Sequence, residues 1–361
     1  MIKLSHKMLI RFYLLICISI FFTTAHAQTG KTKINSATGL QADSTRIFNM
    51  LQSKWGMFLH WSLGTFSGQE WTKGITDPGY FAAKNADTDQ WCRVAKSAGM
   101  GYIIFVAKHH DGFCLWDTKT TNFKVTNSPL KKDVLAQLRK SCDKYGIKLC
   151  LYFSEADWTW DNLENPAMKA AQLKELFTNY GEIPLAWMDV AQWDGGLGHN
   201  ETEDIIRKYQ PNCFIGFNHG LPAGDLQSRE MGSFDKLAAE KKPTLDQNTI
   251  DSLVAINKKY VLQLNWEEAA KIETVLVLHY NRYLLAECAI PINQLNGKWF
   301  WFYNEATKNN AISADKLVAM YNEAVKARVL FSLALGPDKN GQLRPIDVET
   351  LTKAGHQIER K

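Results

Sequence analysis

The sequence lacks two features that mark nucleotide-binding and nucleic-acid-binding proteins. No glycine-rich loop follows any of its apolar runs, so the chain offers no phosphate-binding loop of a nucleotide fold. Basic residues form no stripe, and part of the formal net charge of +5 lies in the N-terminal segment. A nucleic acid is therefore not an expected partner.

Cysteine is scarce, and its spacing excludes the common structural metal sites. The chain has seven cysteines, and no two of them form a Cys-x-x-Cys pair. Cys150 and Cys213 stand inside apolar runs, which indicates small buried hydrophobic side chains rather than metal ligands. A disulfide stays open in an oxidising compartment, but its pairing cannot be read from spacing. We assign no metal and no cofactor.

The apolar run near the N-terminus, residues 12–22, is too short for a comfortable membrane span. Basic residues precede it, and an Ala-x-Ala cleavage site at residues 25–27 follows it, which is the order of a secretory signal peptide. We expect residues 1–27 to be removed and the mature chain to be periplasmic or secreted. A lipid anchor on Cys17 is the alternative, disfavoured because Ile16 stands where a small residue is expected.

After this segment, short apolar runs alternate with amphipathic stretches of helical length. The pattern predicts parallel strands joined by helices. The expected strands are 55–61, 101–108, 147–154, 184–190, 213–219, 283–291 and 329–335, and the expected helices are 87–98, 133–145, 166–180, 201–209, 313–328 and 346–359. We predict a single domain over residues 28–361, with a helical insertion around 236–281 that contains helices at 249–260 and 266–277.

Polar and aromatic side chains gather where the expected strands end. These ends are His60 with Trp61, His109 with His110, Tyr152 to Ser154, Trp187 to Asp189, and Asn218 with His219. Functional residues at the carboxyl ends of parallel strands are typical of a TIM-like (β/α)8 barrel, so we predict this fold, somewhat irregular in its second half. Imidazole and carboxylate groups suit the hydroxyls of a sugar, and indole rings suit its C–H surface.

Taken in order, several segments resemble glycoside hydrolase family 29, the retaining α-L-fucosidases. The most specific is Lys-His-His-Asp-Gly-Phe at residues 108–113, within a similarity that runs from about Lys54 to the C-terminus. The resemblance implies a barrel enzyme that releases terminal L-fucose from fucosylated oligosaccharides or glycoconjugates. The other segments are 55–61, 69–71, 151–154, 187–189, 224–232, 286–287 and 335–338. We expect no C-terminal β-sandwich, although one is common in the family.

The resemblance also assigns the two carboxylates that a retaining glycosidase holds roughly 5 Å apart. Asp189 matches the family's nucleophile, with Asp194 as the alternative, although Val190 replaces the glycine that usually follows. Glu230 matches a loop that carries the general acid and base in one branch of the family. Glu287 is its rival, because an acid inside an apolar strand needs a reason to be buried.

For the sugar pocket, the resemblance points to acidic, imidazole and aromatic side chains: His60, Glu70, Trp71, His109, His110, Trp116, Tyr152, Trp187 and His219. Adjacent histidines diverge along an extended backbone, so His109 and His110 are not expected to share a metal. Phe153 stands where many relatives have a tyrosine. Asn218 and His219 stand where some relatives carry an arginine, which suggests the branch that acts on branched oligosaccharides.

Two other functions stay open at this point. One is the hydrolysis of a related sugar such as an α-L-galactoside, which differs from a fucoside by one hydroxyl at C6. An apolar wall formed by Trp71 and Trp116 favours the methyl group of fucose over it. The other is an inactive glycan-binding barrel, which Val190 and the insertion make credible. The presence of Asp189 argues against a loss of catalysis.

Overall fold

A computed structural model of the chain describes residues 36–160, 164–219, 223–231, 234, 245–265, 267–269, 271–272, 275–276 and 283–359. The chain separates into two compact units, Met1–Ala42 and Asp43–Lys361. Of the first unit, only the beginning of helix α2 (Ser36–Leu51) is described. The predicted signal peptide, residues 1–27, lies outside the described residues. The fold below is that of the second unit.

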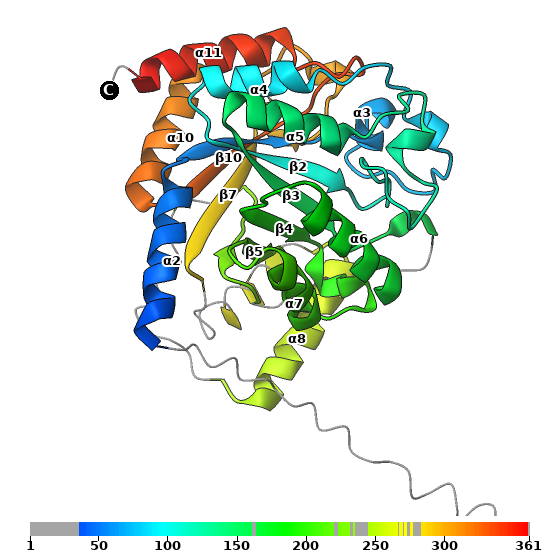
Figure 1. Cartoon of the computed structure of the whole chain (residues 1–361), viewed down its shortest axis with the longest axis vertical. Helices are drawn as coiled ribbons and strands as arrows, with labels where there is room; N and C mark the ends of the chain where they lie inside the picture. The colour runs from blue at the N-terminus through cyan, green and yellow to red at the C-terminus, as the bar shows by residue number, and fades with distance from the viewer. Residues whose placement is uncertain are drawn as a thin grey trace, which may run out of the picture. The chain divides into compact units, whose positions relative to one another are not determined.

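The second unit is built around an eight-stranded parallel sheet that is rolled into a nearly closed barrel, as Figure 1 shows. The strands neighbour one another in the order β5-β4-β3-β2-β1-β10-β7-β6. Their bounds are β1 Trp55–Leu59, β2 Tyr102–Lys108, β3 Lys148–Ser154, β4 Leu185–Asp189, β5 Phe214–Phe217, β6 Leu226–Gln227, β7 Leu285–Pro291 and β10 Leu330–Leu335. A short antiparallel hairpin, β8 (Asn293–Leu295) and β9 (Lys298–Phe300), follows β7. The predicted barrel fold is confirmed.

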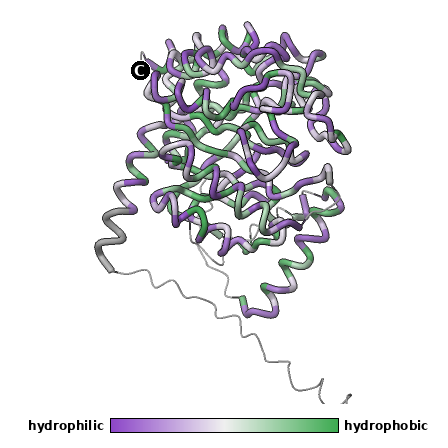
Figure 2. Tube along the Cα trace, turned by 45° about the vertical axis from the view of Figure 1, so that its right-hand side comes forward, coloured by the Kyte–Doolittle hydropathy of each residue, from purple (hydrophilic) through white to green (hydrophobic). Residues whose placement is uncertain are grey.

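The side chains of each strand point alternately to its two faces, and this divides the apolar core into two clusters. In β2, Tyr102, Ile104 and Val106 join one cluster, whereas Ile103, Phe105 and Ala107 join the other. Successive side chains of a strand point to opposite faces, so the first cluster fills the barrel and the second packs between strands and helices. Figure 2 shows hydrophobic residues concentrated on the strands and hydrophilic ones on the outer helices. Burial on both faces is why the strands are continuous apolar runs.

The helices surround the strands largely in chain order: α4 Thr88–Ser97, α5 Val134–Tyr145, α6 Pro166–Asn179, α7 His199–Tyr209, α10 Ala314–Ala327 and α11 Pro345–Glu359. Helix α4 contacts both α5 and α11, and α6 contacts α7. The side chains of Asp87, Asp133 and Asn165 cap the first turns of α4, α5 and α6 by accepting backbone N–H bonds. None of the described helices has the length and apolarity needed to cross a bilayer.

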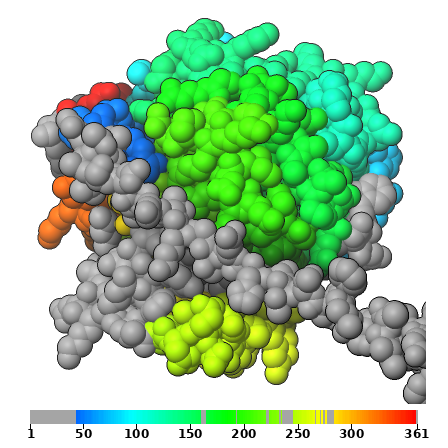
Figure 3. Space-filling view, turned by 60° about the horizontal axis from the view of Figure 1, so that its bottom comes forward, coloured from blue at the N-terminus to red at the C-terminus, as the bar shows by residue number. Residues whose placement is uncertain are grey.

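The second half of the barrel differs most from the sequence prediction. Strand β6 was not predicted, because two residues give no periodic signal. Helix α8 (Gln247–Leu262) confirms the predicted helix at 249–260 and follows β6, where the barrel repeat places a helix. It contacts the 3-10 segment η4 (Ala191–Gly196), and Figure 3 shows its yellow-green surface exposed. The predicted helix at 266–277 lies partly outside the described residues.

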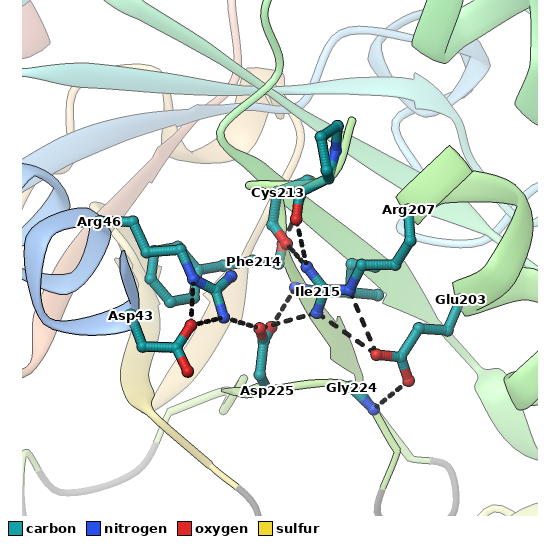
Figure 4. A network of polar contacts seen from close by, with 10 residues as sticks. Asp43, Arg46, Glu203, Arg207, Cys213, Phe214, Ile215, Gly224 and Asp225 are labelled. Carbon is teal, nitrogen blue, oxygen red and sulfur yellow. Dashed lines mark hydrogen bonds and ion pairs between the residues drawn. The ribbon is translucent and has the colours of Figure 1, made fainter. Parts of the chain in front are cut away.

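Charged side chains join β5 to β6 at the seam of the barrel, as Figure 4 shows. The Asp225 backbone N–H donates to the Ile215 carbonyl at 3.0 Å, and its carboxylate accepts the Ile215 N–H at 2.9 Å. The same carboxylate accepts Arg46 and Arg207, each at 2.7 Å. Glu203 accepts the Gly224 N–H at 3.2 Å and pairs with Arg207. A buried aspartate with two arginines thus replaces the regular strand ladder.

Candidate active site

The carboxyl ends of strands β1 to β4 bring one group of imidazole, phenol and carboxylate side chains together. The His60 and His109 rings lie 6.5 Å apart, and the His109 and His110 rings 4.0 Å apart. The His109 ring stacks on Tyr152 at 5.9 Å, and Tyr152 donates to Asp189. These residues lie far apart in the sequence and meet because parallel strands end at the same rim of the barrel.

The Asp189 carboxylate accepts several hydrogen bonds from neighbouring protein groups. Its Oδ2 accepts the Tyr152 hydroxyl at 2.6 Å, and its Oδ1 accepts the Val190 N–H at 2.8 Å and the Asn218 amide at 2.9 Å. The Nε2 atom of His110 lies 3.7 Å from Oδ2. Burial and the Asp189 charge raise the pKa of Tyr152 well above its ordinary value, so its hydroxyl stays a donor. The arrangement holds a buried anion by hydrogen bonds to neutral groups.

Glu230 faces Asp189 from the segment between β6 and β7. A bridge to Ala289 fixes its backbone, and the following Met231 N–H donates to the Ala289 carbonyl at 2.9 Å. Its Oε1 accepts the Asn218 amide at 3.2 Å, and its Oε2 lies 3.8 Å from His219 Nε2. The Glu230 side chain is 31% exposed, against 7% for Asp189. It is therefore the carboxylate of the two that incoming molecules can reach.

Asp189, His219 and Glu230 each offer one atom such that all three lie within 4.8 Å of one another. Among the described residues this is the group whose spacing could also hold a metal ion. The Asp189 oxygens, however, already accept three hydrogen bonds. The spacing fits equally well a pair of carboxylates that act on one substrate atom from two sides.

Glu287, the rival acid, lies deeper in the barrel. Its side chain is fully buried, and its Oε2 accepts the indole N–H of Trp187 at 2.9 Å. Burial raises the pKa of Glu287 to about 8, and the nearby charge of Glu230 adds to this, whereas hydrogen bonds from Ser332 and Trp187 lower it. Glu287 therefore has no exposed surface through which to meet a small molecule, whereas Glu230 has one.

The three pocket histidines are electrically neutral at pH 7. Burial lowers the pKa of His60 to about 4 and that of His110 to about 3, and it lowers the pKa of His109 well below its ordinary value. The His60 Nδ1–H donates to the Phe58 carbonyl at 3.4 Å, which leaves Nε2 as an acceptor. His110 Nδ1 shares a hydrogen with the Ser154 hydroxyl at 2.8 Å. Neutral imidazoles can both donate to and accept from hydroxyl groups.

The remaining predicted pocket residues divide into those near this group and those away from it. Trp187 stacks on Tyr152 at 5.5 Å, and Glu70 accepts the Trp301 N–H at 2.9 Å. Burial raises the pKa of Glu70 to about 7. Trp71 is 48% exposed. The structure does not bring Trp116 into the group, because its ring is buried in the outer core and its N–H donates to Glu175 on α6 at 2.9 Å.

The prediction missed several aromatic residues that line the group. The Trp301 ring lies 5.1 Å from His60, and the Phe302 ring lies 5.5 Å from His60 and 5.0 Å from His109. Trp158 lies 4.7 Å from His110. The signal for the first two was the aromatic run at residues 299–303, which begins inside β9 and belongs to no expected strand end.

Three residues that directly follow functional side chains have left-handed backbone. They are Val190 after Asp189, His219 after Asn218 and Met231 after Glu230, with φ of 47°, 55° and 52°. This region is strained for residues other than glycine, and most of all for a β-branched valine. Such strain is typical of functional sites, where the surrounding structure holds the chain in place.

Comparison with known proteins gives a consistent answer. A family profile described as Alpha-L-fucosidase matches residues 76–361. The chain is 29% identical over 310 residues to Alpha-L-fucosidase 1 of Arabidopsis thaliana, covering 82% of this chain and 56% of that protein. It is 29% identical to Putative alpha-L-fucosidase 1 of Oryza sativa subsp. japonica, covering 83% of this chain and 55% of that one.

Solved structures agree with these relatives. The crystal structure of a glycoside hydrolase 29 family member from an unknown rumen bacterium superposes with a TM-score of 0.69 at 28% identity, over 87% of this chain and 57% of that one. A putative alpha-L-fucosidase from Bacteroides ovatus gives a TM-score of 0.67 at 26% identity, over 87% and 55% of the two chains. The chain thus spans little more than half the length of these relatives.

Proposed function

The chain belongs to the α-L-fucosidase family, glycoside hydrolase family 29, and from that premise we propose that it is an exo-acting α-L-fucosidase that retains anomeric configuration. The observation that carries the proposal is the pair Asp189 and Glu230, which offer oxygens within 4.8 Å of each other at the barrel rim. Retaining glycosidases hold their carboxyl groups about 5 Å apart, whereas inverting ones leave roughly 6.5–9.5 Å for a water. The substrate is a terminal L-fucose on an oligosaccharide or glycoconjugate.

The two carboxylates act in two steps. In the first, an oxygen of Asp189 bonds to C1 of fucose while the bond from C1 to the leaving oxygen breaks, and Glu230 gives that oxygen its proton. In the second, the oxygen of a water attacks C1 while Glu230 takes one of its protons. The bond between C1 and Asp189 breaks as the new bond forms, so Asp189 regains its charge and Glu230 its proton.

The surroundings of the two residues support these roles. Three hydrogen bonds stabilise negative charge on Asp189, as a nucleophile requires. Glu230 is the more exposed of the two, so a leaving group and a water can reach it. Neutral His60, His109 and His110 suit the hydroxyls of an uncharged sugar, and the nearby Trp301 and Phe302 rings suit a methyl group.

We also propose that residues 1–27 direct export and are removed, so that the enzyme acts in the periplasm or outside the cell. The basic, apolar and small-residue segments of the N-terminus support this. A lipid anchor on Cys17 is the alternative outcome.

The proposal is tested by assaying an aryl α-L-fucoside, a fucosyl disaccharide and an aryl α-L-galactoside side by side. We expect both fucosides to be hydrolysed with retained configuration, which NMR of the first-formed sugar reports. A preference for the galactoside would move the function to the related sugar. Binding of fucosylated glycans without hydrolysis of any substrate would identify an inactive barrel.

Two variants then test the roles of the carboxylates. Asp189→Ala should lower kcat by roughly 10⁴-fold or more, because the covalent route is lost. Glu230→Ala should cripple cleavage of the disaccharide but spare the first step on a dinitrophenyl fucoside, whose leaving group needs no proton. Azide should then speed the second step and give a fucosyl azide of retained configuration. Glu349→Ala, on the exposed face of α11, is the control.

Two results would contradict the roles assigned to Asp189 and Glu230. If Asp189→Ala keeps more than a few per cent of the rate, the nucleophile is Asp194 or the mechanism is different. Equal losses on both substrates for Glu230→Ala would remove its role as the acid, and Glu287→Ala would then be assayed in the same way.

A further inference from the structure

One side-chain amide touches both catalytic carboxylates. The Asn218 Nδ2 atom lies 2.9 Å from Asp189 Oδ1 and 3.2 Å from Glu230 Oε1. An amide nitrogen carries two hydrogens, so Asn218 can donate one to each carboxylate at the same time. The residue is buried, 5% exposed, so it acts on the carboxylates and not on solvent.

The backbone of Asn218 is tied to the nucleophile strand on both sides. Its N–H donates to the Met188 carbonyl at 2.8 Å, and its carbonyl accepts the Ala191 N–H at 3.0 Å. These bonds bracket Asp189 and Val190 in the chain. His219, the next residue, has left-handed backbone with a φ of 55°. The amide is thus held at a fixed place relative to Asp189, and its hydrogen bond to Glu230 positions that carboxylate.

We propose that Asn218 is a positioning residue, which fixes the separation of Asp189 and Glu230 by donating one hydrogen bond to each carboxylate from a single amide. The inference rests on the proposed function of the two carboxylates. The amide thus sets the distance between the two carboxylates through hydrogen bonds of 2.9 and 3.2 Å.

A neutral amide suits this task better than a cation would. A positive side chain at the same place would favour ionisation of both carboxylates and so deprive Glu230 of the proton that it must donate. Asn218 donates hydrogen bonds without adding charge. The other titratable groups around the pair are His60, His109, His110, Tyr152, His219 and Glu287. Burial keeps Tyr152 and the first three of these histidines uncharged at pH 7.

The test measures kcat/KM against pH for Asn218→Ala and Asn218→Asp on a fucosyl disaccharide and on a dinitrophenyl fucoside. A hydrogen bond from an amide stabilises a carboxylate more than its neutral acid. Removing it should therefore move both the acidic and the alkaline limb to higher pH, by roughly one unit in Asn218→Ala. The isosteric Asn218→Asp adds a third carboxylate and should move them further. The loss of rate should be larger on the disaccharide, which needs the proton.

Gln210→Ala is the matched control, because its amide also makes two hydrogen bonds, to the carbonyls of Phe177 and Gly181 at 2.9 Å each, before β5 begins. It should lower the melting temperature and leave both limbs in place. Limbs unmoved in both Asn218 variants, with equal losses on the two substrates, would show a merely structural role and overturn the inference alone. A wild-type chain that hydrolyses no fucoside would overturn the proposed function, and this inference with it.

Discussion

The dependence of the protein's stability on pH tests whether Glu287 is protonated in the barrel interior. The side chain is fully buried, and its pKa is raised from 4.5 to about 8, chiefly by burial. In the unfolded chain the same group ionises near its ordinary value. Between these two pH values the native state holds a proton that the unfolded state has released. The stability contributed by neutral Glu287 is therefore complete below about pH 4.5 and is lost as the pH rises through about 8.

The size of the change in the free energy of unfolding follows from the interval between the two pKa values. Each pH unit between the two pKa values lowers the free energy of unfolding by about 1.4 kcal/mol. The whole window corresponds to roughly 5 kcal/mol, a large part of the stability of an ordinary domain. Glu287→Gln cannot ionise, and its carbonyl oxygen can still accept the Trp187 indole N–H. The stability of this variant relative to the wild type should therefore rise by about 4 kcal/mol between pH 5 and pH 8.5.

Urea denaturation followed by tryptophan fluorescence at a series of pH values measures this difference. Burial also raises the pKa of Glu70 to about 7 and that of Asp111 to about 6. Subtracting the wild-type curve cancels the contributions of these two residues to the pH dependence of stability. Glu349→Gln is the control, since Glu349 lies exposed beside Lys353 and should give a flat difference across this range. A flat difference for Glu287→Gln as well would refute the reasoning, because it would mean that Glu287 is ionised inside the barrel at neutral pH.

Two further predictions concern the turn after Asp189 and the N-terminus. Val190→Gly should cost little stability, since relief of left-handed strain, about 1–2 kcal/mol, offsets lost burial, whereas Val106→Gly in β2 should cost several kcal/mol in the same urea experiment. Equal losses at the two positions would show that Val190 is not strained. Mass spectrometry of the exported protein should find a mature N-terminus at or near Gln28. An intact Met1 would contradict export with cleavage, and a diacylglyceryl group on Cys17 would identify a lipoprotein.

The regular part of the fold could be predicted from the sequence, because buried parallel strands and capped amphipathic helices leave periodic patterns. Strands β2 and β3 and helix α5 lie within a residue or two of their predicted bounds. Strand β6 could not be found, since a two-residue strand has no period and its seam depends on Asp225 meeting Arg46 and Arg207 from distant segments. Only the folded chain brings these charges together.

The site was predicted unevenly for a similar reason. Residues at strand ends, such as His109 and Asp189, lie where the strand directs them, so position in the sequence gave their place. Trp116 follows β2 in a loop, where sequence does not determine the direction of a side chain, and it points into the outer core. Trp301 and Phe302 reach the site through the hairpin after β7, which no strand pattern indicated.

The uncharged state of the pocket histidines has a consequence for which sugars the barrel admits. His60, His109 and His110 could have supplied positive charge, but burial keeps them neutral at physiological pH. A uronic or sialic acid would have to leave its hydration shell and enter beside the Asp189 anion without a counter-charge from these rings. On the proposed function, we therefore expect an acidic sugar to bind more weakly than a neutral one. Since the proposed contacts of the imidazoles are to uncharged hydroxyls, we expect binding of a neutral sugar to be nearly independent of ionic strength.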